Sequence, residues 1–465
     1  MLIYLKKLLF STNLYLLLFL IWIIKQIYYS FETLSIYKNL STFLIIFFSF
    51  IFILIFLAVF NLINKKKFLQ YFSIVFFSLF FTNLFFDLFE DNIKKKNNET
   101  FYKDLLKDKN IYNKFDFRTQ KQVVDDLKKI KPNVYPVIHP KHNVTKNSKL
   151  TSNLFPLSGI SKSTIVFCNE SGKYSIYKSD RYGFNNPDIN YDNFTKKKVM
   201  LIGDSYVHGA CVDEENTLSS QLNKINIPSF SISYGGNGPL LELATLIEYV
   251  IVVKPKIILW FYSENDLFDL NDEKKSEILM KYLNDYDFNQ KLTKRQNEID
   301  NFWKELLLRD FNIEDYVYYT KKKNFFQKFL RKVERAFLLK PSRDILKNYY
   351  KEKFKNFYLA RDKSNLELFK RIIFKAKQIS NMHNASFYFV YLPFLKSVQD
   401  KPLDSKNDII KIVEELDIEI IDFYNYLTKE VNKPESFFPL GRHGHYNEEG
   451  YKILSDLISK SLNTF

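Results

Sequence analysis

The sequence predicts an α/β protein: a three-layer αβα sandwich on a parallel sheet, preceded by three transmembrane helices and carrying a helical insertion. Three observations predict this architecture. The chain has 465 residues, which allows roughly two to four domains. Long uncharged apolar runs occur in its N-terminal part. From residue 198 onward, short apolar strands alternate with helical segments, as they do around a parallel sheet that is buried on both faces.

Three apolar runs, at residues 10–24, 42–63 and 68–86, predict the transmembrane helices. A spanning helix needs about 20 apolar residues. The second and third runs meet this length, and the first can be extended by flanking lysines whose ammonium groups reach the interface. No small-residue cleavage site follows the first run, so we do not interpret it as a signal peptide.

Lysines in short loops predict the orientation of these spans. Lys6 and Lys7 precede the first run, and Lys65 to Lys67 separate the second from the third, so both groups belong on the cytoplasmic side. Everything after about residue 90 is then extracytoplasmic, and we expect a multi-pass protein of the plasma (inner) membrane. Lys94 to Lys96 favour the alternative, an even number of spans with a cytoplasmic domain.

A polar connecting region with short β elements follows. Residues 120–130 predict an amphipathic helix, and the proline-containing segment 134–157 predicts an extended chain. Two β-type runs, 164–167 and 174–177, flank Glu170 to Gly172 and predict a hairpin. The resulting organisation is a membrane region at 1–96, an extracytoplasmic connecting region at 97–197, and an α/β domain at 198–465 with an insertion at about 267–365.

The α/β domain is predicted from its alternating pattern. Its expected strands are 199–202, 229–233, 256–262, 386–392 and 418–421, and its expected helices are 214–226, 239–253, 366–383, 407–416 and 449–461. The aromatic-rich segment between 267 and 365 is interpreted as a helical insertion with a small core of its own, the alternative being a lid or a partner-docking subdomain.

Polar residues that can do chemistry follow the strands of this domain. Ser205 comes directly after the first strand, in Gly-Asp-Ser, where open α/β sheets bind ligands. The second strand ends in a glycine-rich loop, residues 234–239, and the third ends at Asn265. The last loop carries His443 and His445 and leads into the final helix. The carboxyl ends of parallel strands meet at one sheet edge, so these side chains are expected to lie together.

The four blocks, in this order, resemble the SGNH (GDSL-type) hydrolase superfamily over residues 198–465 without the insertion. The resemblance implies that Ser205 is the nucleophile and His445 the general base. It also implies an oxyanion hole made by the N–H of Ser205, the N–H of Gly238 and the amide of Asn265, with Gly236 as the alternative glycine. No cofactor and no metal are implied.

The last block departs from the family pattern. The family usually has Asp three residues before the histidine, and here that position is Arg442. If His443 were the base, the corresponding residue would be Leu440. A backbone carbonyl or another acid, such as Asp422, could hold the imidazole instead. A slow enzyme, a Ser–His dyad and a non-catalytic relative therefore all stay open.

The implied reaction is acyl transfer, with Ser205 attacking an ester and the acyl group passing to water or to a sugar hydroxyl. We expect an esterase or O-acyltransferase acting on an acylated envelope glycan or lipid. Expected partners are the membrane and a membrane acyltransferase or polysaccharide-assembly protein. The competing class is a glycan-binding or assembly protein that kept the fold.

Composition limits the remaining possibilities. The net charge of +16 favours anionic lipid or envelope polymers, while the absence of a nucleic-acid-reading motif argues against nucleic acid. Hydrophobic residues make up 46%, which permits a packed core and excludes wholesale disorder. The two cysteines, Cys168 and Cys211, exclude a zinc finger. They either form a disulfide in an oxidising compartment or stay as two buried thiols.

Overall fold

The computed structural model describes residues 77–78, 80–84, 115–145, 154–193, 198–309, 333, 336, 363–400, 405–441 and 444–463. The chain divides into two compact units, and residues 108–320 with 355–465 form the one that concerns function. The three expected membrane spans fall outside the described residues, apart from 77–78 and 80–84. Within the described ranges, no helix has both the length and the apolar character needed to cross a membrane.

A five-stranded parallel sheet organises this unit, with the strand order β5-β4-β6-β7-β8. Almost every residue of β4, β5, β6 and β7 is buried or nearly so, as expected for a sheet covered on both faces. The predicted strands are confirmed with small shifts of their ends. They are β4 (Val199–Ile202), β5 (Ser229–Ser231), β6 (Ile257–Ser263), β7 (Ser386–Leu392) and β8 (Glu419–Asp422).

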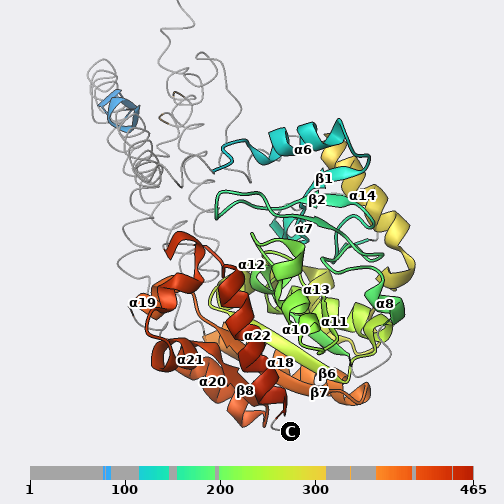
Figure 1. Cartoon of the computed structure of the whole chain (residues 1–465), viewed down its shortest axis with the longest axis vertical. Helices are drawn as coiled ribbons and strands as arrows, with labels where there is room; N and C mark the ends of the chain where they lie inside the picture. The colour runs from blue at the N-terminus through green and yellow to red at the C-terminus, as the bar shows by residue number, and fades with distance from the viewer. Residues whose placement is uncertain are drawn as a thin grey trace, which may run out of the picture. The chain divides into compact units, whose positions relative to one another are not determined.

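Helices cover both faces, which confirms the three layers (Figure 1). Residues of β4 alternate between the two sides, with Met200 in one hydrophobic cluster and Leu201 in the other. The first cluster includes residues of α11 (Pro239–Val253), α18 (Lys363–Met382) and α20 (Lys406–Glu415). The second includes residues of α10 (Leu218–Lys224), α21 (Phe423–Glu430) and α22 (Glu448–Asn463).

The predicted helix 214–226 is shorter than expected. Thr217 has extended backbone angles, and its hydroxyl accepts the N–H of Ser220, so it caps a new helix. A 3₁₀ turn, η1 (Glu214–Asn216), therefore precedes α10. Further short elements are α9 (Ser205–His208), α19 (Leu395–Gln399), η4 (Pro434–Phe437) and η5 (Pro439–Gly441).

The connecting region forms a small sheet of order β1-β2-β3. The predicted hairpin is confirmed, since β2 and β3 pair in antiparallel fashion. The expected extended chain at 134–157 is wrong in part, because residues 141–145 are helical. Pro140 fixes a helical φ there, and its carbonyl accepts the N–H of Asn143. The elements are α6 (Gln120–Lys128), β1 (Val134–Pro136), α7 (Lys141–Thr145), β2 (Thr164–Val166), β3 (Ile176–Lys178) and α8 (Asn190–Asn193).

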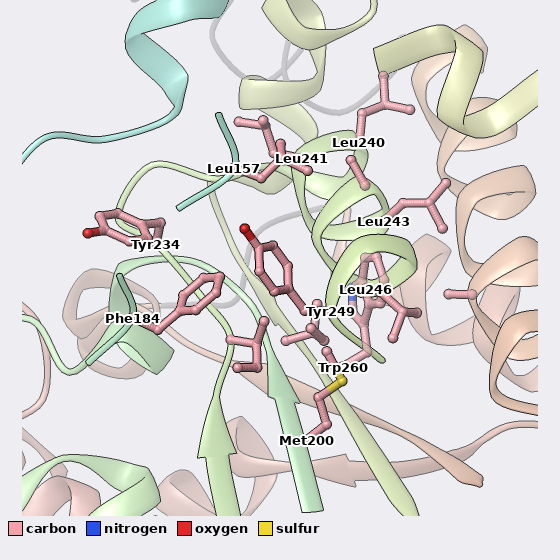
Figure 2. Close-up of a cluster of buried hydrophobic side chains, with 14 of the residues drawn as sticks. Leu157, Phe184, Met200, Tyr234, Leu240, Leu241, Leu243, Leu246, Tyr249 and Trp260 are labelled. Atoms are coloured by element: carbon pink, nitrogen blue, oxygen red, sulfur yellow. The ribbon is translucent and has the colours of Figure 1, made fainter. Parts of the chain in front are cut away.

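This region shares its core with the large sheet. Leu157 and Phe184 pack with Met200 of β4, Tyr249 of α11 and Trp260 of β6 in one buried cluster (Figure 2). A small cluster of Val123, Val124, Val134 and Val166 lies wholly before the boundary that the sequence places near residue 197. The other buried apolar residues of the connecting region, such as Leu157 and Phe184, pack into the core of the large sheet.

The described part of the insertion also packs onto this core. Its helices carry buried residues such as Tyr282 and Trp303, which belong to the same cluster as α11. The indole of Trp303 donates to the carbonyl of Ser158 at 2.7 Å. The expected separate core is thus wrong for residues 267–309, and residues 310–362 lie outside the described part, apart from 333 and 336. The elements are α12 (Asp266–Glu273), α13 (Glu277–Asn284), η2 (Leu292–Lys294) and α14 (Gln296–Arg309).

Candidate active site

Ser205 is the first residue of α9, directly after β4. Asp204 caps this short helix, since its carboxylate accepts the N–H of Tyr206 at 3.0 Å. A Cβ at Gly203 would lie 2.7 Å from Val207, so the turn from strand to helix needs glycine. The turn exposes the Ser205 hydroxyl at the carboxyl edge of the sheet, as the sequence predicts.

His445 meets Ser205 from the other end of the domain. Its Nε2 lies 2.7 Å from Oγ of Ser205, which is hydrogen-bond distance for a general base. The ring also packs against Tyr206, at 4.8 Å between ring centroids. The pairing of these two side chains is the contact that the sequence blocks predict. Residues 442 and 443, which include the alternative base His443, lie outside the described residues.

The carboxylate that orients His445 comes from the connecting region. Oε1 of Glu170 lies 2.9 Å from Nδ1 of His445, and Oε2 accepts the backbone N–H of His445 at 2.8 Å. This double contact fixes both the ring and the backbone of the base. Asp422, which the sequence offers as a substitute acid, instead caps α21 and pairs with Lys406. Glu170 therefore occupies the role of the acid that is missing at position 442.

Two features hold Glu170 in place. A Cβ at Gly444 would lie 2.2 Å from Oε2 of Glu170, and the φ of Gly444 is +87°, so only glycine lets the carboxylate approach. Cys168 and Cys211 form a disulfide between the hairpin and the segment that follows α9. The structure thus selects the first of the two cysteine alternatives, and the disulfide ties Glu170 to the helix that carries Ser205.

The environment of His445 shifts its affinity for protons. Burial alone would lower the pKa of His445, but the charge and hydrogen bond of Glu170, with a smaller effect of Asp204, raise the pKa above its usual value. Burial raises the pKa of Asp204 as well. The imidazole is therefore a stronger base than free histidine, which suits proton abstraction from a serine hydroxyl.

Asn265 faces the same cleft as Ser205 and is itself held. Its Nδ2 donates one hydrogen to Asp269 at 2.8 Å, which leaves the second amide hydrogen for a ligand. Asp269 is paired with Lys141, which comes from α7 of the connecting region. The connecting region thus supports both the base, through Glu170, and the amide donor, through Lys141.

The structure places Gly238 differently from the prediction. Its N–H donates to Glu273 at 2.7 Å, and the N–H of Leu240 donates to the same carboxylate. Gly238 is therefore not available as an oxyanion donor in this structure. The N–H of Gly236 has no acceptor among the residues that the structure describes, and Gly236 has a φ of +75°. Gly236, the alternative glycine, is the one that keeps a free donor.

A row of acids on α12 supports this part of the site. Asp266 accepts the N–H of Ser263, Asp269 holds Asn265, and Glu273 holds the start of α11. Burial raises the pKa of Glu273 to about 8, and burial together with neighbouring acids raises the pKa of Glu242 well above its usual value. Asp266 and Glu273 thus hold backbone N–H groups of the loops, and Asp269 holds a side chain of the site.

His208 has a structural role, because both of its ring nitrogens contact neighbouring residues. Its Nδ1 accepts the N–H of Gly235 at 3.3 Å, and its Nε2 lies 2.9 Å from the hydroxyl of Tyr177. Potential metal-ligand atoms of Glu170, Cys211 and His445 lie within 4.8 Å of one another. Because the sulfur of Cys211 is in the disulfide, it cannot act as a thiolate ligand. This cluster belongs to the site formed by Ser205, His445 and Glu170.

A cleft of about 440 Å³ opens beside the serine. One wall carries Ser205, Tyr206, Asn265, Gly444 and His445. The rest of the lining comes from α19 and the residue before it. This volume suits a small ligand or one unit of a polymer. The arrangement places a hydroxyl, an imidazole and an amide donor around one accessible space, with the acid behind the imidazole.

Glu170 is the functional residue that the sequence analysis missed. The sequence pattern predicts that Glu170 lies in a hairpin turn, outside the four blocks. One signal could have found it: Cys168 lies two residues before it, and a disulfide from Cys168 to Cys211 brings that turn next to α9.

Comparisons with known proteins give structural likenesses only, since no protein-family model and no curated protein matches the chain. A protein assigned to the lipolytic G-D-S-L family, from Desulfitobacterium hafniense DCB-2, is 14% identical with a TM-score of 0.32, over 57% of this chain and 99% of that one. The psychrotrophic esterase EstA of Pseudoalteromonas sp., inhibited by monoethylphosphonate, is 9% identical with a TM-score of 0.29, over 58% and 98%.

A third similar structure is a protein of Bacteroides fragilis NCTC 9343 assigned as an acylhydrolase. It is 12% identical with a TM-score of 0.31, over 58% of this chain and 89% of that one. At these values the likenesses establish neither the reaction nor the substrate of this chain. One of the three is assigned to the G-D-S-L family, and the other two are an esterase and a protein assigned as an acylhydrolase.

Proposed function

We propose that this protein is a serine esterase or O-acyltransferase of the SGNH type. The observation that carries the proposal is the continuous hydrogen-bonded chain from Ser205 through His445 to Glu170. A hydroxyl, an imidazole and a carboxylate in this order form an activated nucleophile, whatever their order in the sequence. The absence of an acid at position 442 favours an inactive relative. Glu170 supplies the carboxylate to His445 instead, so this argument against catalysis no longer applies.

The first half of the reaction forms an acyl-enzyme. Oγ of Ser205 attacks the ester carbonyl while its proton passes to Nε2 of His445. The negative charge moves to the carbonyl oxygen, where the amide of Asn265 and the backbone N–H groups of Ser205 and Gly236 would bind it. The C–O bond to the alcohol then breaks, and His445 returns the proton to the departing oxygen.

The second half releases the acyl group. Water, or a hydroxyl of an acceptor, attacks the acyl carbonyl and gives its proton to Nε2 of His445. The bond to Ser205 breaks, and the proton returns to Oγ. Water as the acceptor gives hydrolysis, and a sugar hydroxyl gives acyl transfer. Glu170 keeps the imidazole in the tautomer with the proton on Nδ1 and stabilises the imidazolium that forms in each step.

The substrate and the location are proposed from the sequence. The three apolar runs would anchor the chain in the plasma (inner) membrane and leave the α/β domain outside the cytoplasm. A disulfide between Cys168 and Cys211 fits such an oxidising compartment. An acylated envelope glycan or lipid is then the substrate class within reach, and a membrane acyltransferase or polysaccharide-assembly protein is a fitting partner.

The activity can be tested on full-length protein purified in detergent. We expect hydrolysis of 4-nitrophenyl acetate that falls at least about a thousandfold in Ser205→Ala. The matched control is Ser436→Ala, an exposed serine on η4. Equal rates for wild type and Ser205→Ala, with both proteins folded, would contradict the proposal. A phosphatase reporter fused after Phe465, active only outside the cytoplasm, tests the topology.

A further inference from the structure

The part of the cleft lining that α19 supplies carries a positive charge. Phe394, Leu395, Lys396 and Gln399 form this part of the lining. Lys396 is exposed, and it has no acidic partner among the residues that the structure describes. Other exposed lysines are paired; Lys121, Lys129 and Lys173, for example, each contact a carboxylate. Among the described residues that line the cleft, Lys396 is the one basic residue besides His445.

The backbone that carries Lys396 is fixed relative to the catalytic groups. Glu264, which immediately precedes Asn265, is buried and accepts the N–H of Phe394 at 3.0 Å and the hydroxyl of Ser397 at 2.6 Å. The hydroxyl of Tyr391 donates to the same carboxylate at 3.0 Å. One buried carboxylate therefore joins the start of α19 to the residue next to the amide donor.

The side chains of α19 point in two directions. Ser397 points inward to Glu264, whereas Lys396 and Gln399, three residues apart on the helix, both reach the cleft. An ammonium group and a carboxamide on one helical face can bind a carboxylate or phosphate group together. The rigid anchor keeps these donors near the acyl-transfer centre instead of leaving them on a mobile surface.

We propose that Lys396, assisted by Gln399, is a specificity-determining residue that selects esters bearing an anionic group. This inference rests on the proposed esterase function and adds the chemical class of its substrate. The anion belongs either to the alcohol part or to the acyl part of the ester. An acylated acidic glycan and an acylated anionic lipid both carry it on the alcohol part.

Two pairs of esters test the proposal and distinguish these positions. For the alcohol part, 4-acetoxybenzoate is compared with its neutral methyl ester. For the acyl part, 4-nitrophenyl hydrogen suberate is compared with methyl 4-nitrophenyl suberate. The quantity measured is the ratio of kcat/KM for the anionic ester to kcat/KM for its neutral partner, so that the intrinsic reactivity of each ester cancels when variants are compared.

In one of the two pairs we expect this ratio to fall about three- to tenfold in Lys396→Gln, and further in Lys396→Glu. Lys396→Arg should keep it, and 0.5 M NaCl should reduce the ratio of wild type. The control is Lys411→Gln, an exposed lysine on α20. Ratios that stay the same in Lys396→Gln for both pairs would overturn this inference, while a folded wild type that hydrolyses none of the four esters would overturn the esterase function itself.

Discussion

Glu170 and His445 are separated by 275 residues in the sequence, yet the carboxylate of one lies 2.9 Å from Nδ1 of the other. The acid of the site therefore lies outside the α/β domain that supplies the serine and the base. Its second oxygen binds the backbone N–H of His445, which fixes the loop before α22 as well as the ring. The connecting region is thus part of the site.

Glu170→Gln should slow the reaction and move its pH profile. We expect kcat/KM to fall between about a hundredfold and ten-thousandfold, because the imidazole loses its orienting acid and the stabilisation of its charged form. Glu170 raises the pKa of His445. The base must be neutral to act, so the acidic limb of the rate profile should lie at lower pH in Glu170→Gln. Glu414→Gln, an exposed glutamate on α20, is the control, and an unchanged acidic limb would argue against the pairing.

Gly444→Ala should disturb the same contact from the other side. The new methyl group would lie 2.2 Å from Oε2 of Glu170, and the backbone at +87° is unfavourable for alanine. We expect a loss of at least about tenfold in kcat with the protein still folded, as judged by circular dichroism. Gly172→Ala, which also sits at positive φ but in the hairpin turn, tests whether backbone strain alone explains the loss. Wild-type kcat in Gly444→Ala would show that the carboxylate tolerates displacement.

Asn265 should stabilise the transition state, and Lys141 should act indirectly by positioning Asn265. Asn265→Ala is expected to lower kcat about a hundred- to a thousandfold with little change in KM. Lys141→Met removes the partner of Asp269, the residue that holds the Asn265 amide, and should lower kcat about ten- to a hundredfold. Lys141→Arg should recover much of the rate. The control, Lys173→Met, breaks an exposed ion pair with Asp213; equal effects of the two Lys→Met changes would refute a positioning role.

Removing the disulfide should affect both stability and activity. It closes a loop with a sequence separation of 43 residues, so its loss should lower the free energy of unfolding by roughly 4 kcal/mol. Because Glu170 lies two residues after Cys168, the double variant Cys168→Ser, Cys211→Ser should also lose activity. Thermal unfolding and kcat/KM are measured for this variant and for reduced wild type. A variant with unchanged unfolding temperature and rate would disprove both roles.

Buried histidines should make the protein sensitive to acid. Burial, followed by the nearby His142 and Lys141, lowers the pKa of His139 to about 3, so the folded protein keeps this ring neutral. The unfolded chain binds a proton there below about pH 6.5, and stability must therefore fall as the pH decreases from 6.5 toward 3. One such group changes the slope by ~1.4 kcal/mol per pH unit.

The variant His139→Phe should show this contribution directly. Its free energy of unfolding, measured in urea between pH 4 and pH 8, should depend less steeply on pH than that of wild type. The difference in slope should correspond to about one proton fewer taken up on unfolding. His383→Phe, which replaces an exposed histidine, is the control for the substitution itself. Identical slopes in wild type and His139→Phe would mean that the buried ring does not titrate on unfolding.

The sequence predicts the large sheet and the position of Ser205 well, because both depend on local patterns. Apolar strands such as β4 and β6 are recognisable from their composition, and Ser205 follows β4 directly. The pairing of Ser205 with His445 is implied by the resemblance of the sequence blocks to the SGNH superfamily. These features need no knowledge of side-chain contacts over long distances.

Other features depend on tertiary contacts that no local pattern encodes. Glu170 lies in a turn whose position is fixed by the disulfide and by the glycine at 444. Gly238 lost its predicted role because Glu273, on a helix 35 residues away in the sequence, accepts its N–H. The separate core expected for the insertion failed because Trp303 packs into the main core. Each of these outcomes is set by a partner far along the chain.

The most direct test of the account is the site of covalent labelling by a fluorophosphonate. Full-length protein in detergent is treated with the reagent, digested and mapped by mass spectrometry. We expect a single adduct on Ser205, formed quickly by wild type and much more slowly by Glu170→Gln and His445→Ala. An adduct on another residue, or labelling of Ser205 at the same rate in all three proteins, would contradict a serine activated by His445 and Glu170.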